Sequence, residues 1–348
     1  MRVFYWASLA LAASGAAPDA GPLGPNNAST VVPQSPERNV TWLLKNVWLQ
    51  SPQSVIHVAK QLFATGAEAV PPLTRTQSFQ RRLEWLDAIA QLSERGYEFR
   101  MDFLRDQAVF GMLQQDGGMR QPRIPFVIHQ TWKTTDIKTH SLDAVACTML
   151  LKKHAPDFYL VLWTDSEIIE LIKIFYPSYL QFYLKLNMNI KRADIARYLI
   201  LQKFGGVYVD LDIEFRGHVG DLIMPSSPNA VLRFVSYRSR EFESKQQPFA
   251  GNAFFACTPK SPIVRDVIKH ALTFRDQKVR DVEGVLKHTG PMGLGEVVAK
   301  YVHAGGGWAE AIRMYNSTVV GNVEDGGKGG PSAAVHRRKH KWGPASPL

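Results

Sequence analysis

Two aspartates in the middle of the chain, Asp210 and Asp212, are the residues whose type and spacing most clearly suggest chemistry. They end the segment RADIARYLILQKFGGVYVDLD, which runs from Arg192 to Asp212. Two carboxylates at the end of a strand can share a hard divalent cation with phosphate oxygens. In open α/β folds, ligands bind outside the carboxyl ends of the strands, where this pair would fall. The pair therefore predicts a site for a divalent cation and a phosphorylated ligand.

A helix, a turn and a buried strand are expected to position these aspartates. Apolar residues recur at helical spacing through 193–201, and the Gly-Gly pair that follows can supply a left-handed cap and a turn. The run 207–213 is typical of a buried strand, which would place both aspartates on one side. On the helix, Asp194 and Arg197 are three residues apart and can share one face.

The elements expected on either side of this unit alternate between strand and helix. Strands are predicted at Phe126 to His129, Tyr159 to Trp163, Ala230 to Phe234 and Ala253 to Cys257, and helices at 142–154 and 166–175, the second capped by Asp165 or Ser166. Such alternation indicates an α/β fold with a mostly parallel sheet and helices on both faces. We expect one Rossmann-like catalytic domain over residues 121–348, ending in a basic tail after a glycine-rich loop.

The N-terminal third of the chain has a different character. Residues 1–17 are typical of a secretory signal peptide or a short signal anchor, which would associate the protein with a membrane. Residues 18–40 are rich in Pro, Gly, Asn and Ser and predict a flexible linker. Residues 41–120 predict a helical stem. These features predict the secretory pathway, in the Golgi lumen or at the Golgi membrane.

The overall charge limits the class of partner. The 348 residues carry a formal net charge of +10, so an anionic ligand or surface is expected, either a nucleoside diphosphate or an anionic membrane face. No zinc-finger, RNA-binding or basic-zipper pattern is present, which argues against a nucleic-acid partner. Cys147 and Cys257 could form one disulfide in a secretory lumen or remain two buried thiols.

Five motifs in order resemble one family of enzymes. They are HQTWK at 129–133, APDFYLVLWTD at 155–165, YPSYL at 176–180, the segment with Asp-X-Asp, and NAFFACTPKSP at 252–262. Together they are similar to the sugar-binding Asp-X-Asp glycosyltransferases, which include yeast initiating α-1,6-mannosyltransferases and inositol-phosphoceramide mannosyltransferases. The resemblance covers about residues 121 to 300. It implies a glycosyltransferase-A fold, a GDP- or UDP-sugar donor, Mn²⁺ or Mg²⁺, and a glycan or glycolipid acceptor.

The resemblance also implies a role for each matched residue. Asp210 would contact the ribose or sugar and the metal, and Asp212 would hold the metal. Asp194 and Arg197 would bind sugar hydroxyls, and Trp132 would stack on the base. The donor and metal sites would be completed by Asn252, His336 and His340, with Trp342. Structural alternatives stay open. Trp132 could be a core aromatic, Asp194 and Arg197 a surface ion pair, and both histidines solvated parts of a basic tail. Asn252 could instead orient the acceptor or cap a turn, and His129 is expected to be structural.

Three functions are compatible with these residues. The first is a metal-dependent, retaining transfer of a hexose, with mannose favoured, in which Asp210, Asp212 and Arg197 act at the reaction centre. The second is a phosphohydrolase, because a strand ending in Asp-X-Asp also begins sites in which the first Asp attacks phosphorus. There the motif lies early in the domain and Thr or Val follows it, whereas Ile213 and Glu214 follow here. The third is a catalytically silent protein that binds sugar nucleotides, and the presence of every matched acidic residue argues against it.

Overall fold

The computed structural model describes residues 75–96, 121–136, 141–226, 230–239, 247–275, 277, 281–322 and 333–336. The chain divides into two compact units, Met1–Ala88 and Ile89–Leu348. Helix α4 (Arg75–Glu94) crosses this division and falls within the predicted helical stem. The predicted signal and linker lie outside the described residues. None of the helices in the described ranges is long and apolar enough to span a membrane.

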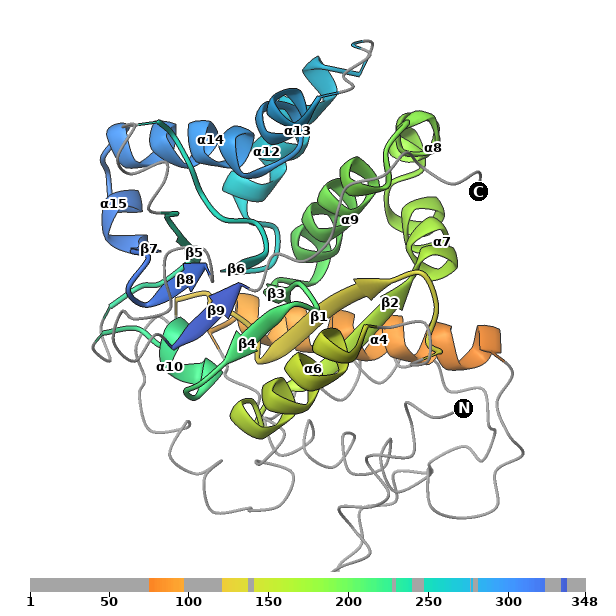
Figure 1. Cartoon of the computed structure of the whole chain (residues 1–348), viewed down its shortest axis with the longest axis horizontal. Coiled ribbons are helices and arrows are strands. Elements are labelled where there is room, and N and C mark those ends of the chain that lie inside the picture. Colours follow the sequence, from red (N-terminus) through yellow and green to blue (C-terminus); the bar gives the residue numbers. More distant parts are fainter. Residues whose placement is uncertain are drawn as a thin grey trace, which may run out of the picture. The chain divides into compact units, whose positions relative to one another are not determined.

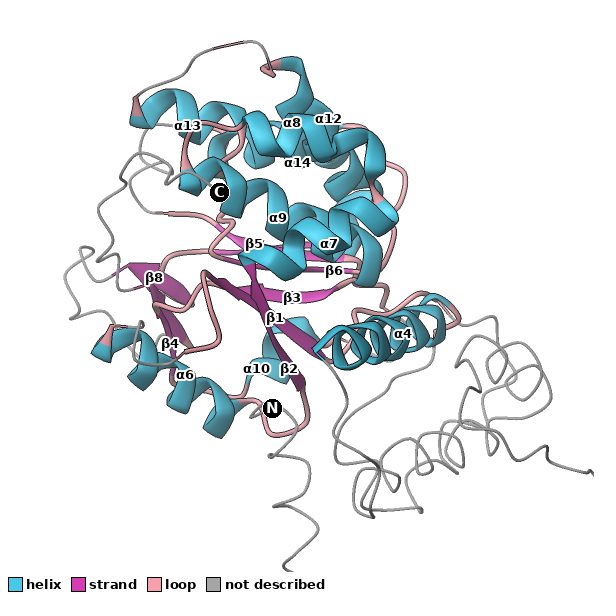
Figure 2. Ribbon diagram, turned by 90° about the vertical axis from the view of Figure 1, so that its right-hand side faces the viewer, coloured by secondary structure: helices cyan, strands magenta, loops and turns pink. Residues whose placement is uncertain are grey.

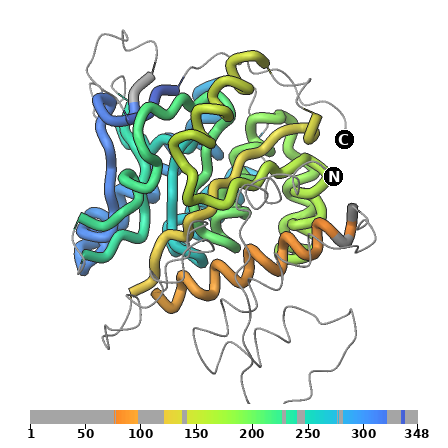
Figure 3. Tube along the Cα trace, turned by 90° about the horizontal axis from the view of Figure 1, so that it is seen from below, coloured from red at the N-terminus to blue at the C-terminus, as the bar shows by residue number. Residues whose placement is uncertain are grey.

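A six-stranded sheet in the order β2-β1-β3-β6-β5-β7 forms the centre of the second unit. Its strands are β1 (Val127–Trp132), β2 (Tyr159–Thr164), β3 (Gly206–Val209), β5 (Phe234–Tyr237), β6 (Phe254–Cys257) and β7 (Ile312–Tyr315). Strand β6 is antiparallel to both of its neighbours, and the other pairs are parallel, so the predicted α/β fold with a mostly parallel sheet is confirmed. In Figure 3 the blue C-terminal part of the trace lies at the left of the unit and the yellow-green part farther to the right, in agreement with β2 and β7 as opposite edges.

A second, three-stranded sheet lies beside the first. Its strands are β4 (Ile213–Phe215), β9 (Ala334–His336) and β8 (Val320–Asn322), with β9 in the middle. Strand β9 runs antiparallel to β4 and parallel to β8. This sheet joins the middle of the chain to a short segment near its end.

Helices cover both faces of the central sheet (Figures 1 and 2). They are α6 (Leu142–His154), α7 (Asp165–Phe175), α8 (Leu180–Lys185), α9 (Asn189–Phe204), α10 (Val219–Ile223), α12 (Pro262–Thr273), α13 (Val282–His288), α14 (Pro291–His303) and α15 (Trp308–Ala311), with a 3-10 turn at Pro177–Tyr179. Figure 2 shows α7, α9, α12 and α14 on one side of the sheet and α6 and α10 on the other. The core between these layers is apolar and aromatic, which is the main driving force for the arrangement.

A buried histidine fixes the turn that leads into the site. Trp163 Nε1 donates to His129 Nδ1 at 3.1 Å, so the other ring nitrogen, Nε2, carries the proton and donates to the Gly205 carbonyl at 3.1 Å. Gly205 has a φ of +64° and caps α9, and a Cβ there would lie 2.6 Å from the Pro259 nitrogen. Only glycine fits this close approach with this backbone. The predicted structural role of His129 and the predicted glycine cap are both confirmed.

Two sequence predictions are wrong, and one of the two open alternatives for the cysteines is confirmed. The N-cap of α7 is Thr164, not Asp165 or Ser166, because Thr164 and Glu167 exchange backbone and side-chain hydrogen bonds in a capping box. Strand β5 covers Phe234–Tyr237 rather than Ala230 to Phe234. Cys147 and Cys257 are both buried and are not joined by a disulfide.

Candidate functional site

The two aspartates of the Asp-X-Asp motif lie in a turn rather than in a strand. Strand β3 ends at Val209, and Ile213 N donates to the Asp210 carbonyl at 3.1 Å, which closes the turn. The predicted strand through Ile213 is therefore wrong, because Ile213 begins β4 in the second sheet. The turn carries the chain from one sheet to the other. As a result, Asp210 faces residues of the first sheet while Asp212 faces the second.

His336 completes a group of three metal-ligating side chains. Because β9 pairs with β4 and places His336 opposite Ile213, the imidazole reaches the turn, with Nε2 3.4 Å from Asp212 Oδ1. One ligand atom each from Asp210, Asp212 and His336 lies within 4.8 Å of the others. His336 is therefore not part of a solvated tail, while the predicted contributions of His340 and Trp342 lie outside the described residues.

The donor set fits a divalent cation. Two carboxylates with open positions for phosphate oxygens and water suit Mg²⁺ or Mn²⁺, and an imidazole adds a third ligand atom. The Nδ1 atom of His336 is buried and has no hydrogen bond, so no structural hydrogen bond holds the imidazole through that nitrogen. We assign Asp210, Asp212 and His336 as the residues that would hold the ion.

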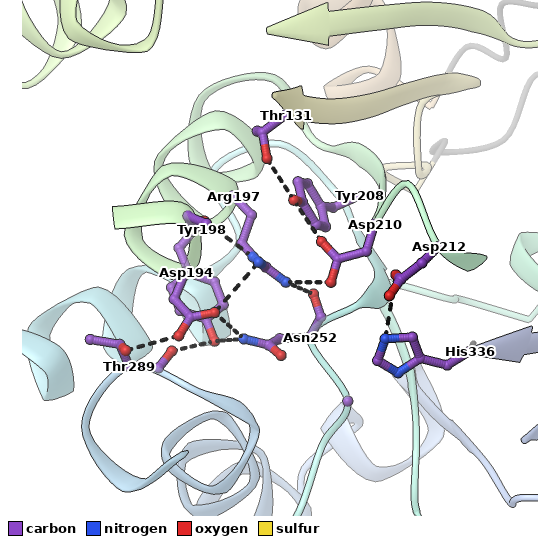
Figure 4. A network of polar contacts seen from close by, with 12 residues as sticks. Thr131, Asp194, Arg197, Tyr198, Tyr208, Asp210, Asp212, Asn252, Thr289 and His336 are labelled. Atoms are coloured by element: carbon purple, nitrogen blue, oxygen red, sulfur yellow. Dashed lines mark hydrogen bonds and ion pairs between the residues drawn. The ribbon is translucent and has the colours of Figure 1, made fainter. Parts of the chain in front are cut away.

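Protein groups already engage both carboxylate oxygens of Asp210 (Figure 4). Tyr208 OH donates to Oδ1 at 2.9 Å and lies 2.9 Å from Thr131 Oγ1, while Arg197 Nη1 lies 3.3 Å from Oδ2. Burial raises the pKa of Asp210, the charge of Arg197 lowers it, and the neighbouring Asp212 raises it. These contacts hold the carboxylate in one orientation toward the turn.

Arg197 is the buried centre of the network. Its guanidinium donates to the carbonyls of Ala193 at 3.1 Å and Asn252 at 2.7 Å, and it lies 3.5 Å from Asp194 Oδ1 and 4.5 Å from the centre of the Tyr208 ring. With 3% of its side chain exposed, it is not a surface ion-pair residue. Burial lowers the pKa of Arg197, but the negative charges around it outweigh that effect and the net shift is upward. The guanidinium therefore stays charged between two carboxylates.

Asp194 lies on the other side of Arg197. Asn252 Nδ2 donates to Oδ1 at 2.8 Å and to Tyr198 OH at 3.2 Å, and Thr289 Oγ1 donates to Oδ2 at 2.9 Å. Burial raises the pKa of Asp194 to about 7, against the opposing effects of Arg197 and the two donated hydrogen bonds. Asn252 thus supports the buried network instead of capping a turn. Direct contact of Asp194 or Asn252 with a sugar stays a prediction.

Trp132 lies at the edge of the sheet where these groups gather. It ends β1, which is parallel to β3, so the carboxyl ends of both strands point the same way. Its side chain is half-buried, which leaves part of the ring accessible. The base-stacking role of Trp132 stays a prediction.

Sequence reasoning missed four polar residues that organise this site: Thr131, Tyr198, Tyr208 and Thr289. The two tyrosines fall on positions that a sequence pattern assigns to a buried helix face and a buried strand, so they looked like core residues. A buried tyrosine hydroxyl needs a hydrogen-bond partner, and that requirement was the signal available. Thr289 bonds to a residue 95 positions earlier, and no local pattern indicates such a contact.

Comparison with known proteins gives a consistent assignment. Residues 143–229 match the family described as glycosyltransferase sugar-binding region containing DXD motif. The chain is 46% identical over 90 residues to inositol phosphoceramide mannosyltransferase 3 of Schizosaccharomyces pombe, covering 26% of this chain and 24% of that protein. It is 39% identical over 111 residues to mannosyl phosphorylinositol ceramide synthase SUR1 of Saccharomyces cerevisiae, covering 32% and 28%.

Other matches extend further along the chain. Inositol phosphoceramide mannosyltransferase 1 of Schizosaccharomyces pombe is 28% identical over 204 residues, which is 58% of each chain. Among solved structures, the PaToxG glycosyltransferase aligns with a TM-score of 0.37 at 16% identity, over 65% of this chain and 79% of that one. The aligned regions thus span from about a quarter to about three-fifths of the curated relatives' length. Residues 143–229 therefore match the sugar-binding region of the Asp-X-Asp glycosyltransferases, the family that the motifs resemble.

Proposed function

We propose that this protein is a metal-dependent, retaining glycosyltransferase that moves a hexose, with mannose favoured, from a GDP- or UDP-sugar to a glycolipid hydroxyl. The observation that carries the proposal is the convergence of Asp210, Asp212 and His336 within 4.8 Å, beside the buried cation of Arg197. The names of the relatives support a mannosyl donor and a phosphorylated inositol lipid as acceptor. The predicted Golgi location would suit such a reaction.

The proposed reaction exchanges one bond at the anomeric carbon for another. The acceptor hydroxyl attacks this carbon on the face from which the nucleoside diphosphate leaves, so the configuration is retained. The bond between that carbon and the β-phosphate oxygen breaks, and the hydroxyl proton passes to the departing phosphate. A divalent cation held by Asp210, Asp212 and His336 would supply positive charge to offset the charge that grows on the diphosphate. Arg197 and Tyr208 hold Asp210 in place, so its carboxylate needs no reorganisation during the reaction.

The environment of Asp210 argues against the hydrolase alternative. In that reaction the first aspartate of the motif attacks phosphorus and needs an accessible oxygen. Here Oδ1 accepts a hydrogen bond from Tyr208 and Oδ2 is paired with Arg197. Both interactions draw electron density from the carboxylate and make it a weaker nucleophile, while the second lone pair of each oxygen can still ligate a cation.

A donor screen tests the proposal. The full chain is incubated with a panel of GDP- and UDP-sugars, with and without Mn²⁺, and release of the nucleoside diphosphate is measured. We expect metal-dependent release from one donor, lost in Asp212→Ala and unchanged in Asp221→Ala, whose carboxylate is 82% exposed. The absence of both donor turnover and metal-dependent donor binding would refute the proposal.

A further inference from the structure

Helix α6 carries the two most exposed large hydrophobic side chains in the part of the chain that the structure describes. Leu142 is 89% exposed and Met149 is 68% exposed. Ala146 and Lys153 are also exposed, and the four residues follow one another at helical spacing, so that they form one line along the helix. This line of four exposed residues is called the α6 stripe below.

The α6 stripe lies on the side of the helix that faces away from the core. The opposite side is formed by Ala144, Cys147 and Leu151, which are buried. Leu151 belongs to the core cluster that also contains Ile213 and Phe215 of β4. The outer side of a helix on a globular protein is normally polar, whereas the outer side of α6 is mostly apolar. Exposed apolar side chains that line up in this way mark a surface that contacts another apolar partner.

The stripe begins at the edge of the sheet where the site lies. Strands β1 and β2 are parallel neighbours, so α6, which connects them, runs back from their carboxyl ends to their amino ends. Leu142, the first residue of α6, is therefore at the same edge of the sheet as Trp132, the last residue of β1. Helix α6 also contacts β4, which begins directly after Asp212. A partner that covers the stripe would thus lie next to the proposed active site.

The charges beside the stripe indicate which apolar partner fits it. Lys153 ends the stripe and Lys152 lies next to it, and both side chains are exposed. Lysines beside an apolar line can lay their methylene groups on apolar surface and place their ammonium groups among lipid phosphates. A second copy of the chain would instead bring together two molecules that each carry a net charge of +10. An anionic lipid surface is complementary to both the apolar and the basic side chains.

We propose that the α6 stripe docks the protein on an anionic membrane surface. Leu142 and Met149 enter the boundary between head groups and acyl chains, and Lys152 and Lys153 pair with lipid phosphates. This inference rests on the proposed function and deepens it, because a glycolipid acceptor presents its hydroxyl at the membrane surface. Docking through α6 holds the site at the level of the head groups, so the acceptor does not have to leave the bilayer.

A fluorescent label on the stripe tests whether this helix meets the membrane. The full chain is mixed with phosphatidylcholine vesicles, with and without phosphatidylserine, which is anionic but is not a glycolipid. Met149→Cys is labelled with an environment-sensitive fluorophore, to which the buried Cys147 and Cys257 are not accessible. We expect the emission of this label to shift to the blue when anionic vesicles are added. The same label at Val302→Cys, which is 38% exposed on α14 on the other side of the sheet, should not respond.

Sedimentation with the same vesicles measures the affinity. Leu142→Ser combined with Met149→Ser should weaken binding to anionic vesicles by about tenfold or more, because two apolar side chains no longer leave water. Lys152→Gln combined with Lys153→Gln should weaken binding to anionic vesicles by about tenfold and leave binding to phosphatidylcholine alone unchanged. Ile174→Ser, at a position 49% exposed on α7 on the other side of the sheet, is the matched control and should bind like the original protein.

Release of the nucleoside diphosphate from a soluble donor separates this inference from the proposed function. It should be unchanged in the variant with Leu142→Ser and Met149→Ser, because both side chains are exposed and neither is part of the site. Docking by a protein that turns over no donor would support the role of the stripe and refute the proposed function.

Three results would overturn the inference. They are a label at Met149 that does not respond to vesicles, vesicle binding that is unaffected by Leu142→Ser with Met149→Ser, and binding that does not depend on phosphatidylserine. A dimer in light scattering that the same double replacement converts to a monomer would also overturn it, because the stripe would then belong to an interface between two copies of the chain.

Discussion

Replacement of Arg197 by methionine is the sharpest test of how the site is built. The guanidinium is 3% exposed and lies 3.3 Å from Asp210 and 3.5 Å from Asp194, so its removal leaves one buried carboxylate, Asp194, and one partly buried carboxylate, Asp210, without a counter-charge. Removing one partner of a buried ion pair typically costs about 3–5 kcal/mol. The lost hydrogen bonds to the carbonyls of Ala193 and Asn252 act in the same direction. A loss of this size is a large part of the roughly 5–15 kcal/mol that stabilises an ordinary domain.

The free energy of unfolding would be measured by urea denaturation at pH 7.5. Arg265→Met is the matched control, because Arg265 also lies 3.1 Å from a carboxylate, Asp266, but the two side chains are 52% and 34% exposed. An exposed pair contributes about 0–1 kcal/mol, so the control should change little. Asp194→Asn combined with Arg197→Met should recover part of the loss, because it removes one of the two stranded charges. If Arg197→Met costs no more than Arg265→Met, the buried network does not stabilise the fold.

Two further predictions concern stability. Burial raises the pKa of Asp194 from about 3.9 in the unfolded chain to about 7, so the folded state binds this proton more tightly. The stabilisation by this proton is present below about pH 4 and is lost as the pH rises to about 7, and it amounts to roughly 4 kcal/mol for a shift of about three pKa units. Asp194→Asn should remove this part of the pH dependence of the unfolding free energy, measured with urea from about pH 4.5 to 8. A variant curve parallel to that of the original protein would contradict the assignment. Gly205→Ala should lower the unfolding free energy by about 2 kcal/mol or more, because Gly205 has a positive φ and an added Cβ would lie 2.6 Å from Pro259. Gly217→Ala is the control, because no atom lies within 4 Å of its added Cβ, and it should leave the unfolding free energy unchanged. Equal changes in the melting temperature of the two variants would argue against the close approach at Gly205.

The sequence predicted best those features that depend on neighbouring residues. The helix 142–154 was predicted with the bounds of α6, and the strand at Tyr159 to Trp163 differs from β2 by one residue. Both elements have patterns of apolar residues that define their type locally. The resemblance implied that Asp194, Arg197 and Asp210 serve the same sugar donor, and the structure brings the three together because the turn at Gly205 reverses the chain.

The parts of the site that sequence patterns did not predict depend on contacts between distant segments. Thr289 bonds to Asp194, which no pattern indicated. The family resemblance, and no local pattern, had implied His336 at the metal site, and His336 reaches Asp212 because β9 pairs with β4. The same pairing explains why the predicted strand does not continue past Val209, since Ile213 bonds into the second sheet. Strand β9 is short and lies in a glycine-rich, basic part of the sequence, where no periodic pattern of apolar residues predicts a strand. Its pairing with β4 therefore determines its structure.

The central claim is that Asp210, Asp212 and His336 hold a divalent cation shared with a nucleoside diphosphate. Electron paramagnetic resonance of Mn²⁺, titrated with the protein in the presence of GDP or UDP, tests this directly because bound ions lose the signal of free Mn²⁺. We expect one ion bound per chain, with affinity reduced at least about tenfold in Asp212→Asn and in His336→Gln and unchanged in Asp221→Asn. Equal Mn²⁺ binding by the original protein, Asp212→Asn and His336→Gln would contradict the account.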